Sequence, residues 1–129
     1  MKQGVVIAHG PLGAAYIEAA KTIMGTDDGL FALSVTDMSV HEIASRLESI
    51  VNDTREDVDG IVIMACLRGG SSWNVSAAVV RDKPKVQLIS GVNLAMLLTF
   101  LTKRDSLPLD ELTAKLKSEA VDGVTILEK

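Results

Sequence analysis

Near the start of the chain stands the segment Gly4-Val5-Val6-Ile7-Ala8-His9-Gly10-Pro11-Leu12-Gly13. Its residues 5–8 form an apolar run without polar alternation, which is typical of a strand in a parallel sheet that is covered on both faces. Gly10 breaks this strand, and Pro11 suits the first position of a helix, where its missing N–H costs no hydrogen bond. The segment therefore predicts a buried parallel strand, a tight turn and a helix, with His9 at the turn.

The helix after this turn is predicted to cover residues 12–24, and Gly25 is expected to end it. His9 then lies at the carboxyl end of a strand and beside a helix N-terminus. Ligands bind at the carboxyl ends of the strands in open parallel sheets, and helix N-termini attract anions. Two interpretations of His9 follow. It is a nucleophile for a phosphoryl group, or it merely ends the strand with its ring bonded to a neighbouring carbonyl.

The rest of the chain repeats the alternation of strand and helix. We predict further strands at residues 30–35, 60–65 and 86–89, and a short final strand at 124–127. Helices are expected to begin near Ser39, Ser71, Asn93 and Pro108, with Ser39 and Asn93 as N-caps. Strands that alternate with helices indicate an α/β fold with a doubly wound, mostly parallel sheet and right-handed crossovers. A length of 129 residues is that of one domain, residues 1–129.

Three loops are expected to meet at the carboxyl edge of this sheet, because parallel strands all end there. They are the loop at His9, the loop at 66–74 and the loop at 90–93. The glycine pair of the middle loop allows the backbone to bend sharply and to approach an anion. Ser71 or Ser72 is expected to cap the helix that follows this pair.

Composition and charge exclude several classes of function. The formal charge of −4 and the isoelectric point near 5.1 argue against nucleic acid or an anionic membrane as the main partner. Cys66 is the only cysteine, so there is no intrachain disulfide, no zinc site is expected, and a reducing compartment fits. The apolar runs fall short of the roughly 18 residues of a membrane span, and no secretory signal precedes the first strand. We expect a cytoplasmic protein without membrane insertion, with His41 as an ordinary surface histidine.

Three motifs, in order and over almost the whole chain, resemble one known family. They are His9-Gly10-Pro11, then Gly69-Gly70-Ser71 followed by Asn74, then Ile89-Ser90-Gly91-Val92-Asn93-Leu94-Ala95-Met96-Leu97. The combination resembles the EIIA component of the mannose-type phosphotransferase system. The resemblance implies that His9 accepts a phosphoryl group from the phosphocarrier protein HPr. His9 would then pass the group to a histidine of the EIIB component, which phosphorylates an incoming sugar, and neither a metal nor an organic cofactor is needed.

The same resemblance implies roles for further residues and an assembly. The phosphoryl oxygens are expected to be held by Ser71, the backbone of Gly70 and the side chain of Arg68. Cys66 and Asn93 are expected to support these residues and His9 without touching the phosphoryl group. The family forms a homodimer that exchanges its last strand. An exchange of residues 124–127 would account for the short detached strand, and a second subunit would account for the apolar helix at 94–101. Any association with a membrane permease complex would be peripheral.

One loop departs from the family pattern. The family usually has Thr-Asp-Leu-Phe before Gly-Gly-Ser, and its aspartate bonds the histidine and selects the tautomer, whereas this chain has Ala65-Cys66-Leu67-Arg68. A thiol is a weaker partner than a carboxylate, so we expect slower phosphorylation. Arg68 can offset this by pairing with the phosphoryl group or with an acidic partner. A second hypothesis therefore stays open, a regulatory or non-catalytic binding module that keeps the fold, and the sequence does not name a sugar.

Overall fold

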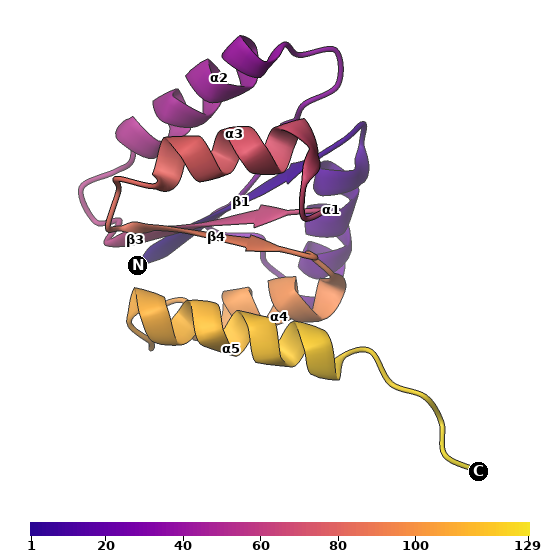
Figure 1. Cartoon of the computed structure of the whole chain (residues 1–129). Helices are drawn as coiled ribbons and strands as arrows, with labels where there is room; N and C mark the ends of the chain where they lie inside the picture. Colours follow the sequence, from indigo (N-terminus) through magenta and orange to yellow (C-terminus); the bar gives the residue numbers. More distant parts are fainter.

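The apolar runs of the sequence form one parallel sheet in the computed structural model, which describes residues 1–129 (Figure 1). Its strands are β1 (Lys2–Ala8), β2 (Leu30–Ser34), β3 (Gly60–Ala65) and β4 (Val86–Ser90). Their order is β2-β1-β3-β4, and every neighbouring pair is parallel. The predicted α/β fold with a four-stranded parallel sheet is therefore confirmed.

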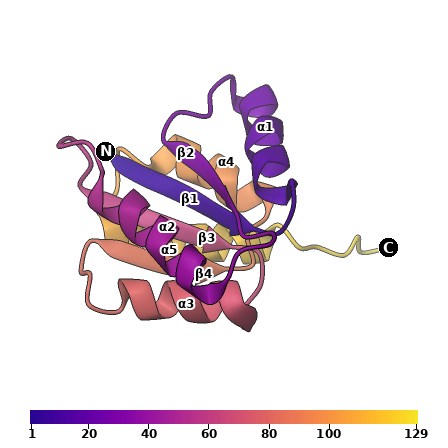
Figure 2. The ribbon, with the colours of Figure 1, turned by 90° about the horizontal axis from the view of Figure 1, so that it is seen from above.

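Helices cover both faces of the sheet. They are α1 (Leu12–Met24), α2 (Val40–Asn52), α3 (Gly70–Val80), α4 (Leu94–Lys103) and α5 (Leu109–Asp122). The helices α2 and α3 lie on one face, and α1, α4 and α5 lie on the other (Figures 1 and 2). Each predicted helix is present. Where the sequence also predicted the end of a helix, the observed end lies within a few residues of it.

The covering of both faces explains why the first strand is an unbroken apolar run. Val5 and Ile7 pack in the core under α2 and α3, whereas Val6 packs in the core under α1, α4 and α5. All of these side chains are fully buried. Alternate residues of a strand point to opposite faces, so a strand with two covered faces needs an apolar residue at every position.

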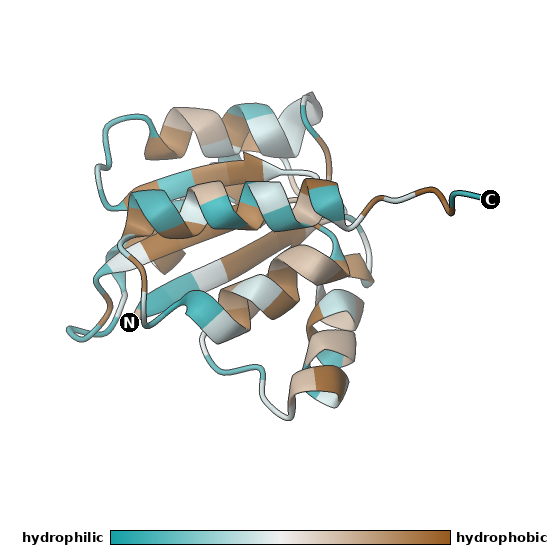
Figure 3. Cartoon of the chain, turned by 90° about the horizontal axis from the view of Figure 1, so that it is seen from below, coloured by the Kyte–Doolittle hydropathy of each residue, from teal (hydrophilic) through white to brown (hydrophobic).

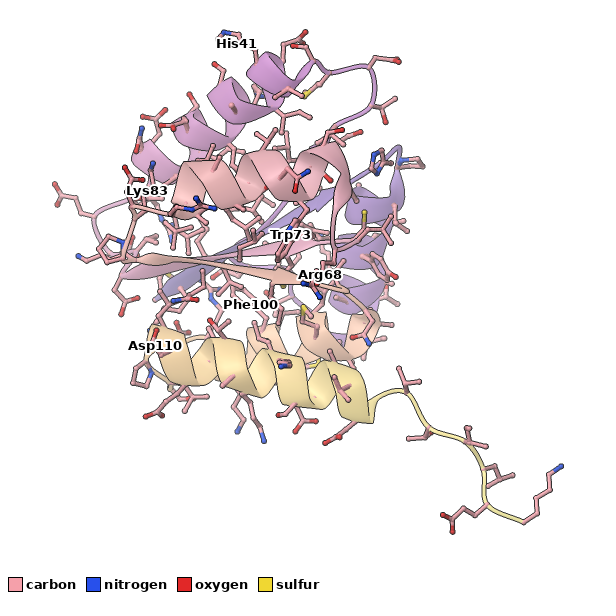
Figure 4. The ribbon with its side chains drawn as sticks, viewed as in Figure 1. His41, Arg68, Trp73, Lys83, Phe100 and Asp110 are labelled. Atoms are coloured by element: carbon pink, nitrogen blue, oxygen red, sulfur yellow. The ribbon has the colours of Figure 1, made fainter.

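The apolar helix α4 is covered largely by its own chain. It packs against α1 on one side and α5 on the other, and its Phe100 is fully buried beneath the sheet (Figure 4). The sequence suggested a second subunit as its cover. In the structure α1, α5 and the sheet supply most of that cover.

Two predicted helix caps are confirmed. Ser39 Oγ accepts a hydrogen bond from Glu42 N at 3.1 Å at the start of α2, and Asn93 Oδ1 accepts one from Met96 N at 2.9 Å at the start of α4. Such a cap satisfies an N–H that has no partner within the helix. Gly25 ends α1 with φ of 77°, in the left-handed region that favours glycine.

The predicted final strand is wrong for this chain taken alone. Residues 124–127 form no strand, and the C-terminal segment leaves the domain after α5 (Figure 1). Its apolar residues are 78% (Val124), 92% (Ile126) and 82% (Leu127) exposed. The extended C-terminal segment is coloured hydrophobic over part of its length in Figure 3. A strand needs a neighbour for its backbone hydrogen bonds, and the segment meets no strand of its own chain.

None of the five helices combines the length and the apolar character needed to cross a bilayer.

Candidate functional site

The backbone on one side of His9 is held by loops that follow other strands. Val35 N, directly after β2, donates to Ala8 O at 3.0 Å, and Cys66 N, directly after β3, donates to Ile7 O at 3.2 Å. These bonds continue the pairing of the sheet beyond the ends of its strands. His9 therefore lies where the central strand β1 ends, between the loops of both of its neighbours.

The turn on the other side of His9 is also anchored. Gly10 adopts φ of 57°, a left-handed conformation that redirects the chain from β1 into α1. Its N–H donates to Thr36 Oγ1 at 2.6 Å, and Thr36 Oγ1 also accepts from Ser34 Oγ at 3.2 Å. No sequence motif indicated a role for this loop. The only local signal is a pair of hydroxyl residues, Ser34 and Thr36, at the end of the edge strand β2.

The imidazole of His9 is exposed and lies near the thiol of Cys66. Its Nδ1 lies 3.9 Å from Cys66 Sγ, which is close to the upper limit for a hydrogen bond to sulfur. A thiol is both a weak donor and a weak acceptor, so this contact orients the ring only loosely. Because Nδ1 makes the contact, Nε2 is the ring nitrogen left for another partner.

The loop from β3 to α3 presents exposed groups on the same edge of the sheet. Leu67 and Arg68 are exposed, and Figure 4 shows Arg68 beyond the carboxyl ends of β3 and β4. Gly69 and Gly70 have φ of 84° and 78°, and a Cβ at either would meet no atom within 4 Å. The left-handed conformation, rather than lack of space, is therefore what favours glycine at both positions.

The helix α3 begins earlier than the sequence suggested. Gly69 is its N-cap, without a side-chain cap, and Gly70 is its first residue. The prediction that Ser71 or Ser72 caps this helix is wrong, because the left-handed glycines start the helix before either serine. Ser71 is instead an exposed residue of the first turn, where backbone N–H groups lack partners within the helix, and Ser72 is buried.

The predicted site residues fall into two groups. His9 and Cys66 are in contact, Arg68 follows Cys66 on the loop, and Gly70 and Ser71 begin α3 at the same edge. Asn93 is used elsewhere, because its Oδ1 caps α4 and its Nδ2 donates to Ala120 O at 3.0 Å near the end of α5. No hydrogen bond joins Asn93 to His9.

Two other residues are placed as ordinary structural or surface residues. Trp73 packs against the core under α2 and α3. His41 is exposed at the start of α2, on the outer side of the helix layer (Figure 4).

The site is open. A groove of about 770 Å³ lies between α1 and β2, and His9 is not among its lining residues. No three side chains of His, Cys, Asp or Glu gather closely enough to hold a metal ion.

The clearest shift in pKa lies at the opposite edge of the sheet, where the N-terminal amino group and then Lys2 lower the pKa of the Asp59 carboxyl.

Comparison with known proteins identifies the family. The family model EIIA-man, described as "PTS system fructose IIA component", matches residues 4–117. The chain belongs to the EIIA-man family. Members of this family of phosphotransferase-system components are in general phosphoryl carriers with HPr and EIIB as partners.

This EIIA-man protein has distant curated relatives. It is 24% identical over 115 residues to the fructose-specific EIIA component of Bacillus subtilis strain 168. That match covers 88% of this chain and 78% of the relative. It is 28% identical over 128 residues to the mannose-specific EIIAB component of Escherichia coli K12. That match covers 96% of this chain but 39% of the relative, so the chain spans less than half of the relative's length.

Solved structures share the EIIA-man fold closely. The EIIA component from Streptococcus agalactiae superposes with a TM-score of 0.88 at 23% identity, covering 98% of this chain and 97% of that one. A mannose/sorbose-specific IIA subunit from Enterococcus faecalis gives a TM-score of 0.82 at 23% identity, covering 100% and 97%. The resemblance inferred from the three sequence motifs is therefore confirmed at the level of family and fold.

Proposed function

We propose that this protein is a phosphoryl carrier of a phosphoenolpyruvate-dependent sugar phosphotransferase system. It accepts the phosphoryl group on His9 from HPr and passes it to an EIIB component. The observation that supports this best is the placement of His9, exposed at the carboxyl end of the central strand of an EIIA-man fold, with Nδ1 in contact with Cys66 and Nε2 free.

The transfer needs only the imidazole and nearby donors. The lone pair of His9 Nε2 attacks phosphorus in line, and the P–N bond of the donor phosphohistidine breaks with its electron pair staying on the donor's nitrogen. His9 Nδ1 keeps its proton, so the phosphorylated ring carries a positive charge. Arg68, the Ser71 hydroxyl and the free N–H groups at the start of α3 are the donors that would stabilise charge on the phosphoryl oxygens.

The openness of the site fits a protein donor. A phosphohistidine on another protein can approach an exposed ring but cannot enter a closed pocket. We place this exchange in the cytoplasm, because the chain has one cysteine and carries no disulfide. Any association with a permease complex would be peripheral.

The same loop supports a second candidate function. Cys66 stands where the family pattern has an aspartate, and its Sγ lies 3.9 Å from His9 Nδ1. Arg68, on the same loop, is exposed. A module that binds an anionic group or an acidic partner protein without turning over a phosphoryl group would have these features. This alternative is a regulatory branch of the family rather than a transport component.

We further propose that the protein is a homodimer that exchanges its C-terminal segment. The strand β4 pairs only with β3, so its outer edge has unpaired backbone groups. Residues 124–127 are apolar at three of their four positions and exposed. A segment from the partner that pairs with β4 would cover both features.

Intact-mass measurement of the purified protein after incubation with phosphoenolpyruvate, enzyme I and HPr tests the carrier function. The wild-type protein and a His41→Ala control are expected to gain one acid-labile phosphoryl group, and His9→Ala is expected to gain none. His41 is a matched control because it is the second exposed histidine of the chain and lies on α2. A folded wild-type protein that gains no phosphoryl group would favour the binding module instead.

A further inference from the structure

The loop from β2 to α2 holds His9 from both sides. Val35 N donates to Ala8 O at 3.0 Å, and Thr36 Oγ1 accepts from Gly10 N at 2.6 Å. Two consecutive residues of one loop thus bind the two residues that flank the phosphoryl acceptor. Of the two bonds, the Thr36 bond depends on a side chain, so it can be removed by substitution.

The hydroxyl of Thr36 is itself held in place. Its oxygen accepts one hydrogen bond from Gly10 N–H and a second from Ser34 O–H at 3.2 Å. A hydroxyl has two lone pairs and one hydrogen, so both lone pairs are occupied. The next residue, Asp37, has φ of 60°, a left-handed conformation that turns the chain back toward α2.

The turn at Gly10 needs such an anchor. Glycine has more backbone freedom than any other residue, and Gly10 directly follows the residue that must react. In-line attack requires the ring nitrogen to be held within a small range of positions. Cys66 Sγ restrains the ring only through a contact of 3.9 Å, so the backbone bonds on either side are the stronger restraint.

We propose that Thr36 is a positioning residue for His9, acting through the hydrogen bond from Gly10 N–H to its hydroxyl. This inference rests on the proposed carrier function. Thr36 supplies an acceptor that sets the direction of the Gly10 turn, and through it the place of the His9 ring. It makes no contact with the phosphoryl donor.

The test compares Thr36→Val, which keeps the shape but removes the acceptor, with Thr36→Ser, which restores the hydroxyl. Thr22→Val is a matched control, because Thr22 bonds a main-chain carbonyl, Glu18 O, on the exposed side of α1. Phosphorylation of His9 is followed by quench-flow over a range of phosphorylated HPr concentrations. The amide resonance of Gly10 is followed by NMR in the same variants.

Thr36→Val is expected to lower the maximal rate about tenfold, the effect of losing one hydrogen bond to a positioned group, with KM for HPr unchanged. Thr36→Ser and Thr22→Val should stay within about twofold of wild type, since both keep that bond. The Gly10 amide resonance should move in Thr36→Val alone. Thermal unfolding should show only the small loss of stability expected from one exposed hydrogen bond, so the protein stays folded.

Other results would overturn the proposal. A wild-type rate in Thr36→Val would do so while the carrier function stands. So would an equal loss in Thr36→Ser, because the hydroxyl alone would then fail to keep the rate. A rise in KM alone would also do so, because it would make Thr36 a contact for HPr. A wild-type protein that accepts no phosphoryl group would overturn the carrier function and this proposal together.

Discussion

At the scale of single residues, the departure of this chain from its family lies next to His9. Cys66 is half-buried, and its Sγ lies 3.9 Å from His9 Nδ1. A carboxylate accepts a shorter, stronger hydrogen bond from an N–H than sulfur does. A carboxylate that accepts this bond orients the imidazole and favours the tautomer in which the Nε2 lone pair can attack phosphorus. Cys66 provides the same contact in a weakened form.

Substitutions at Cys66 measure how weak that contact is. Cys66→Asp should increase the rate at which His9 accepts the phosphoryl group by about tenfold, because a charged acceptor holds Nδ1–H more strongly. Cys66→Ala should change the rate by no more than about twofold. Both rates are measured by quench-flow with phosphorylated HPr. A Cys66→Ala protein as inactive as His9→Ala would show instead that the thiol is essential.

At the scale of elements, the hydrogen bonds between helices contribute to the fold as well as those within each helix. Asn93 caps α4 with its Oδ1 and donates its Nδ2 to Ala120 O in α5, so one half-buried side chain fastens two helices together. Ser39 caps α2 with a single bond and is exposed. The two residues make the same kind of cap in different surroundings, which permits a direct comparison.

Asn93→Ala is expected to lower the free energy of unfolding by about 2 kcal/mol, because the cap is lost and Ala120 O loses its partner. Ser39→Ala should cost about 1 kcal/mol, the usual value for a cap alone. Urea denaturation followed by circular dichroism gives both values. Equal costs for the two variants would mean that the bond to α5 contributes nothing measurable.

Local sequence was enough to predict most elements. The apolar run at residues 5–8, the cap at Ser39 and the left-handed glycine at Gly25 act within a few residues of themselves, so their signals can be found by inspection. The start of α3 was predicted wrongly, because Ser71 resembles a cap. The left-handed Gly69 is the N-cap instead, and the helix begins at Gly70, before either serine.

At the scale of the whole molecule, the exposed C-terminal segment stands apart from an otherwise covered fold. Each face of the sheet has its own buried core, and even the apolar α4 lies mostly under α1 and α5. Val124, Ile126 and Leu127 remain exposed beyond α5. Exposed apolar residues and an unpaired sheet edge in one chain are typical of an interface between copies of that chain.

Removal of residues 124–129 tests the proposed exchange. The full chain is expected to elute as a dimer in size-exclusion chromatography with light scattering, and the shortened chain as a monomer with an unchanged circular dichroism spectrum. Glu128→Gln serves as a control that keeps the apolar residues and should remain dimeric. A shortened chain that is still dimeric would place the interface elsewhere, and a monomeric full chain would rule the exchange out.

The site itself could be predicted only in part. Sequence motifs single out His9 and the loop from Cys66 to Ser71, because glycines and a histidine directly after buried strands are local signals at a shared sheet edge. The bond from Gly10 N to Thr36 Oγ1 joins residues 26 apart, and no local pattern announces it. Asn93 was predicted as a cap and as a supporting residue of the site, and the structure uses both of its polar atoms in α4 and α5.

The sequence by itself determined the α/β fold, the order along the chain of its four strands and five helices, the family and the position of His9, because apolar periodicity, caps and glycine turns act over short distances along the chain. Only the tertiary structure decided which side chains meet. Arg104, buried with its Nε donating to Lys2 O at 2.9 Å, joins residues 102 apart, and Thr36 reaches Gly10 from a neighbouring strand's loop. Such pairs depend on the register of the sheet and the packing of helices on it, which arise only when distant segments are brought together.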